Sequence, residues 1–104
     1  PMDVRLRIDV IKGGAPASPR VELPAARARG PRADLLITTG VETDLMAAAR
    51  SAVRQMIDHL TGVHGLAPEL AYCLCSVAAD LRISEIVNAP NWVVALYLPR
   101  DVIA

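Results

Sequence analysis

Aromatic residues are scarce in this sequence: phenylalanine does not occur, and Tyr72, Trp92 and Tyr97 are the only tyrosines and tryptophan. A surface on which single-stranded nucleic acid stacks its bases needs several aromatic rings, so the composition argues against that class of protein. Net charge is also lacking, because eleven basic residues balance eleven acidic ones, and no basic stripe of the kind that binds a phosphate backbone appears. We therefore expect no nucleic-acid partner.

Long apolar runs are missing as well. No stretch approaches the roughly 20 apolar residues of a membrane span. The N-terminal residues lack the charged and apolar regions of a signal peptide. We expect a soluble, cytoplasmic chain with no membrane partner.

Cysteine occurs only at Cys73 and Cys75. On a helix, side chains two residues apart point about 200° away from each other, so this pair can neither form a disulfide nor chelate one metal ion. We expect two small buried apolar side chains in a reducing compartment. A reactive thiol is the alternative, although no cation or histidine lies near in sequence to lower its pKa.

The 104 residues allow one domain, residues 1–104, with a single core. Hydrophobic residues make up 53% of the chain, which is high for so small a unit and indicates a partner surface.

The first part of the chain shows strand patterns. Residues 3–10 alternate strictly between apolar and charged side chains, which predicts a half-buried strand. A turn at Gly13-Gly14, a short strand over 20–23 and a loop over 24–33 follow. Residues 35–39 predict another strand, which we expect Gly40 to end.

The middle of the chain predicts two helices, over roughly 43–62 and 68–80. We expect Thr43 to cap the first helix and Gly62 to end it. The second helix begins at Pro68 and is apolar nearly all round, so we expect it to be covered on several sides.

Two strand patterns close the chain. Residues Ile83 and 86–87 predict a brief strand, and the continuous apolar run 92–98 predicts a strand that is buried on both faces. The fold class that follows is α+β, with a mixed or antiparallel sheet and two helices.

The order of several short motifs resembles the acetamidase/formamidase family. These motifs are Ile37-Thr38-Thr39-Gly40-Val41, Asp44-Leu45, Met56-Ile57, the residues 68–72 and 75–87, Pro90-Asn91-Trp92-Val93-Val94 and Leu98-Pro99. The resemblance implies the C-terminal third of a hydrolase that converts small linear amides to a carboxylate and ammonia. It also implies a divalent metal such as zinc in some members, and catalytic segments that lie upstream. Asn88 departs from the aspartate expected in many relatives, which puts any role of that carboxylate in doubt.

Two groups of residues are candidates for the chemistry. Asp80 and Glu85 flank the junction between a buried helix and a strand, where a carboxylate is expected either to pair with a cation or to have a functional role. They are candidate catalytic residues, and a structural ion pair with Arg82 is the alternative. Thr38, Thr39 and Gly40 lie at a strand end and are candidate substrate-binding residues, or else they simply form the turn into the helix.

Other polar residues do not form a recognisable site. His59 and His64 are five residues apart and miss the four-residue spacing of metal ligands on a helix, so no zinc ligands are evident. Ser76 has no nucleophile elbow around it, and we expect its hydroxyl to bond back to its own helix.

Two functions are therefore compared. The first is a segment of an amide hydrolase that is not catalytic alone and needs a complementary N-terminal region or chain. The second is a non-catalytic binding or self-assembling module, a homo-oligomer that associates through residues 68–80 and 92–98.

Overall fold

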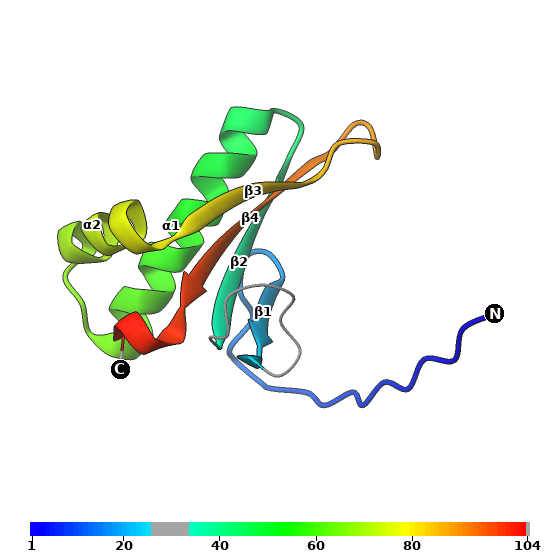
Figure 1. Ribbon diagram of the computed structural model, residues 1–104, viewed down its shortest axis with the longest axis horizontal. Coiled ribbons are helices and arrows are strands. Elements are labelled where there is room, and N and C mark those ends of the chain that lie inside the picture. The colour runs from blue at the N-terminus through cyan, green and yellow to red at the C-terminus, as the bar shows by residue number, and fades with distance from the viewer. Residues whose placement is uncertain (26–33, 104) are drawn as a thin grey trace.

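The structure is a computed structural model that describes residues 1–25 and 34–103. Its strands are β1 (Arg20–Leu23), β2 (Leu35–Glu42), β3 (Asp80–Glu85) and β4 (Trp92–Pro99). Its helices are α1 (Leu45–His64), α2 (Pro68–Ala78) and the short 3₁₀ helix η2 (Arg100–Ile103). The strands form one antiparallel sheet in the order β1-β2-β4-β3. The expected α+β class with two helices is confirmed (Figure 1).

The main core lies between the sheet and the helices. In β2 and β4 the cross-strand pairs Leu36–Leu98, Thr38–Leu96 and Gly40–Val94 bring alternate residues to one face. That face packs on α1, whose buried side chains recur at helical spacing, and on α2. The helical members of this core are Ala48, Ala52, Met56, Leu60, Ala71 and Cys75.

The opposite face of the sheet has a smaller apolar centre. Ile37 and Ala95 on this face are only 7% and 3% exposed, although no helix of the described residues covers them. The guanidinium of Arg82 lies 4.7 Å from the ring centroid of Tyr97 and shields part of this face. Buried residues on both faces of β4 confirm the prediction made from its continuous apolar run.

The ends of α1 differ from the expectation. Asp44, not Thr43, is the N-cap, and its carboxylate accepts a hydrogen bond from the backbone N–H of Ala47 at 2.8 Å. The helix runs past Gly62 and ends at Gly65, which adopts a left-handed φ of 67° and donates its N–H to the carbonyl of Thr61. Of Gly62 and Gly65, it is Gly65 that takes the backbone conformation that a side chain would disfavour, which explains why the helix ends there.

The second helix and its following strand also differ in their bounds. The helix α2 ends at Ala78 rather than at residue 80. The brief strand predicted from Ile83 and residues 86–87 is present as β3, but it occupies residues 80–85 and so includes Ile83 and not 86–87. The expected cover of α2 is not present among the described residues, since Leu70, Tyr72 and Val77 are all more than half exposed. None of the helices in the described residues is long and apolar enough to cross a membrane.

The strand predicted over residues 3–10 is not formed. In the described structure this segment belongs to no sheet and extends away from the fold (Figure 1). The turn after it is present, with Gly13 at a φ of 77°. The prediction failed because alternation reports the side-chain period of a strand, whereas a strand also needs a neighbouring backbone to pair with.

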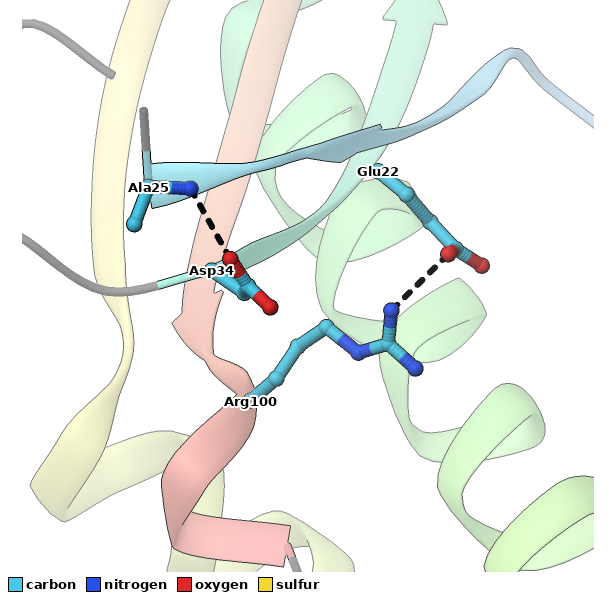
Figure 2. Close-up of polar contacts among 4 residues, drawn as sticks. All are labelled: Glu22, Ala25, Asp34 and Arg100. Atoms are coloured by element: carbon cyan, nitrogen blue, oxygen red, sulfur yellow. Dashed lines mark hydrogen bonds and ion pairs between the residues drawn. The ribbon is translucent and has the colours of Figure 1, made fainter. Parts of the chain in front are cut away.

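Three polar contacts hold β1, β2 and η2 together, and Figure 2 shows the two that involve the side chains of Asp34 and Glu22. The N–H of Ala25 donates to the carboxylate of Asp34 at 2.8 Å, which ties the end of β1 to the start of β2. Arg100 donates its backbone N–H to the carbonyl of Asp34 and its guanidinium to Glu22, at 2.8 and 2.9 Å. The loop predicted over 24–33 lies, from residue 26 onward, outside the described residues.

Candidate functional site

A hollow of mixed polar and apolar lining lies where residues 13–17 pass over α1 and the start of β1. Its volume is about 330 Å³, near the lower end of the range of about 300–1,000 Å³ that is usual for small-molecule sites. In liquid water each molecule takes about 30 Å³, so the hollow has room for a small ligand and its hydration. The charged, titratable or amide side chains that line it are Arg20, Gln55, Asp58 and His59.

Arg20 and His59 are in direct contact in this hollow. The Nη1 of Arg20 lies 3.0 Å from the Nδ1 of His59. Because a guanidinium has donors and no acceptor, Arg20 donates and the Nδ1 of His59 accepts. The imidazole is then neutral, with its proton on Nε2, and that N–H is a second donor at this site.

Burial and charge both favour this neutral imidazole. Partial burial lowers the pKa of His59 below its usual value of 6.5, and the positive charge of Arg20 is the second cause. His64, whose ring centroid is 5.7 Å away, and Arg100 lower the pKa further, while Glu22 opposes them. His59 is therefore uncharged at neutral pH.

Gln55 fixes the wall of the hollow. Its side-chain amide donates to the carbonyl of Thr39 at 2.8 Å and accepts from the N–H of Ser18 at 3.1 Å. The hydroxyl of Thr39 donates to the carbonyl of Pro19 at 2.6 Å. These bonds attach the segment before β1 to both α1 and β2, and so position Arg20 beside the helix.

The hollow is lined by one side chain of each charge. Arg20 supplies donors, and Asp58, on the same turn of α1 as His59, supplies an acceptor. Neither charge forms an ion pair within the described residues. A primary carboxamide has one strong acceptor and one NH₂ donor group, which matches this pair of partners.

Asp80 and Glu85 lie elsewhere, at the two ends of the edge strand β3. The carboxylate of Asp80 is exposed and bonds to the guanidinium of Arg82 at 2.6 and 2.7 Å. This is the ion pair that the sequence offered as the alternative to catalysis. Glu85 is partly buried beside the register shift between β3 and β4.

Thr38, Thr39 and Gly40 lie inside β2 rather than at its end, because the strand continues to Glu42. Thr38 is 1% exposed and donates its hydroxyl to the carbonyl of Ala52 at 2.8 Å. It lines the inner wall of the hollow. Gly40 packs against the backbone of α1.

Nucleophiles and metal ligands are not gathered at any one place in the described residues. Residues 1–25 and 34–103 contain no group of three or more His, Cys, Asp or Glu that can hold a metal ion, so they do not fit a zinc site by themselves. Ser76 donates to the carbonyl of Tyr72, as expected. Cys75 is buried, which raises its pKa, whereas Cys73 is exposed, contrary to the prediction that both are buried.

The sequence interpretation missed Arg20 and Asp58 and placed His59 merely on the surface. The adjacent polar residues Asp58 and His59 on an otherwise amphipathic helix were the only local signal. Arg20 is 39 residues from His59, and only the sheet brings β1 beside α1.

The fold and the hollow define an α+β unit in which two helices cover one face of a four-stranded antiparallel sheet. The sequence model of the Acetamidase/Formamidase family matches residues 2–104. The chain therefore belongs to the acetamidase/formamidase family, as its motif order suggested.

Two solved structures are similar to the chain. The acetamidase from Yersinia enterocolitica is 27% identical with a TM-score of 0.64, and the match covers 67% of this chain and 21% of that one. The acetamidase from Bacillus halodurans is 32% identical with a TM-score of 0.62, over 65% of this chain and 23% of that one. The match thus spans less than a quarter of either acetamidase. A search among curated proteins found no match.

Proposed function

We propose that this chain is the C-terminal segment of an amide hydrolase that acts on small linear amides, such as formamide and acetamide, and releases ammonia. The observation that carries this proposal is the family match over residues 2–104, together with a structural match that spans only 21% and 23% of two acetamidase chains. The segment then contributes part of an enzyme whose other parts belong to a complementary N-terminal region or chain.

Catalysis by the described residues alone is not supported by their geometry. Amide hydrolysis needs a nucleophile or activated water, an acid for the leaving nitrogen and donors for the oxyanion. The hydroxyl of Ser76 bonds to its own helix, the thiol of Cys75 is buried, and Asp80 is paired with Arg82. We therefore propose that the isolated chain is inactive.

The hollow is the part of this chain that we propose contacts the amide. In this proposal Arg20 donates to the amide oxygen and Asp58 accepts from the NH₂ group, with the Nε2–H of His59 as a further donor; the support is that all three residues line the hollow. Thr38 lines the same hollow, which supports one of the substrate-binding residues proposed from the sequence. Asp80 and Glu85 are the acid–base candidates if the chain hydrolyses amides by itself.

The experiment is an ammonia-release assay on formamide and acetamide, with and without added zinc. It uses the isolated chain and a chimaera in which this chain replaces the matching segment of the Bacillus halodurans acetamidase. We expect an inactive isolated chain and an active chimaera, with Arg20→Gln raising the KM of the chimaera. Arg54→Gln is the matched control, since Arg54 lies on α1 but does not line the hollow.

Two results would count against this proposal. Ammonia release by the isolated chain would show that the segment is catalytic alone, and Asp80→Asn and Glu85→Gln would then be the first variants to assay. A folded but inactive chimaera, with an isolated chain that is a stable oligomer by light scattering, would favour the self-assembling module instead. The exposed apolar residues of α2 are the observation behind that second function.

A further inference from the structure

The N-terminal segment combines the pattern of a strand with the exposure of a free tail. Residues 3–10 alternate without a break, and their apolar members Val4, Leu6, Ile8 and Val10 are 65%, 79%, 84% and 84% exposed. The opposite side carries Asp3, Arg5, Arg7 and Asp9. Four aliphatic residues at every second position are typical of a strand with one buried face, and here that face is exposed to solvent.

The local geometry of the segment is already that of an extended strand. The Nε of Arg7 lies 3.0 Å from a carboxylate oxygen of Asp9. Residues two apart share one side of the chain only when the backbone is extended, so the charged face and the apolar face are separated here. The composition is also unlike that of a disordered tail, which is poor in β-branched aliphatic residues.

The segment is also part of the family sequence rather than an appendage. The family match begins at residue 2 and so includes residues 3–10. In both acetamidases more than three quarters of the polypeptide lies outside the structural match. Among the described residues the segment pairs with no strand, so its partner strand and the apolar surface that covers it are to be expected in this larger remainder.

We propose that residues 3–10 form a β-strand that pairs with an open strand edge of the remaining amidase polypeptide and buries Val4, Leu6, Ile8 and Val10 against its apolar surface. The identity of this partner rests on the proposed function. The charged face stays in solvent, where its alternating signs provide cross-strand partners for charged residues of the neighbouring strand. The turn at Gly13 then leads the chain back to the hollow, so the docked strand anchors the loop 13–17 that forms one wall.

Hydrogen–deuterium exchange on the full chain and on the acetamidase chimaera tests this inference. We expect the backbone amides of residues 3–10 to be unprotected in the isolated chain. In the chimaera we expect protection by at least about 100-fold, because a paired strand opens only rarely. Leu6→Asp should abolish this protection, whereas Arg5→Asp, which places the same residue on the charged face, should leave it intact.

The outcomes separate this inference from the proposed function. Protected amides in a chimaera without amidase activity support the strand and count against the enzymatic proposal. An active chimaera with unprotected residues 3–10 overturns the strand while the enzymatic proposal stands. Protection in the isolated chain that grows with its concentration shows pairing with a second copy, which also overturns the inference.

A second measurement keeps the inference testable if the chimaera does not fold. The isolated chain is added to the acetamidase polypeptide from which the matching segment has been deleted, and binding is followed by light scattering. Binding by the natural chain and the Arg5→Asp variant, but not by the Leu6→Asp variant, is the expected result. Equal binding by all three chains, or by none, contradicts it.

Discussion

Replacing Gly40 by alanine should destabilise the fold far more than one methyl group suggests. Gly40 lies opposite Val94 in the centre of the sheet, where α1 crosses β2. A Cβ at this position would lie 2.8 Å from the backbone nitrogen of Ala52, 2.9 Å from the carbonyl carbon of Ala48 and closer still to the carbonyl oxygen of Ala48. Ala48 and Ala52 are completely buried. No side-chain rotation relieves these contacts, because the obstacle is the backbone of the helix.

The magnitude follows from the need to move the helix away from the sheet. Overpacking a core costs typically about 1–3 kcal/mol, and we expect the upper end here because the contacting atoms belong to the backbone. A chain of this size has a free energy of unfolding of about 5–15 kcal/mol. With an m value of roughly 2 kcal/mol/M in urea, a loss of about 3 kcal/mol lowers the unfolding midpoint by about 1.5 M.

Urea unfolding followed by far-ultraviolet circular dichroism measures this effect, and Gly62→Ala is the matched control. Gly62 lies inside α1, and a Cβ at this position would meet no other atom within 4 Å. The same substitution there should stabilise the chain by about 0.5–1 kcal/mol, because alanine favours the helix over glycine. A Gly40→Ala variant whose stability stays within about 0.5 kcal/mol of the natural chain would refute the close approach of α1 to β2.

Two further predictions concern titratable groups. The pKa of His59 is lowered by burial and by Arg20, so at pH values between its native pKa and its usual value of 6.5 only the unfolded state binds the proton. The stability that the neutral His59 contributes should be fully present above pH 6.5 and should be lost as the pH falls through this window. Urea unfolding midpoints at a series of pH values would measure this loss. A His59→Asn variant whose stability falls equally with pH would contradict this origin. A thiol-reactive disulfide reagent should modify Cys73 and spare Cys75 in the native chain, because Cys75 is 6% exposed and burial raises its pKa. A Cys73→Ser variant that still reacts before unfolding would contradict this prediction.

The candidate site was only partly accessible to prediction. Thr38 was proposed from the sequence and does line the hollow, whereas Arg20 and Asp58 were not proposed. The contact between Arg20 and His59 joins residues 39 positions apart, and their spacing in the sequence carries no information about it. The strand order β1-β2-β4-β3 and the bonds of Gln55 decide which side chains meet there.

The sequence by itself determined the elements whose signals are local. The helical period of residues 45–60, Pro68 at the start of α2 and the apolar run of β4 are properties of short stretches, and each element is present in the structure. The tertiary structure alone decided that Gly65 rather than Gly62 ends α1, that Cys73 is exposed and that residues 3–10 have no partner among the described residues. The physical reason is the same in each case. Period and propensity act between near neighbours, whereas burial, strand pairing and the lining of a hollow depend on which distant segments the fold brings together.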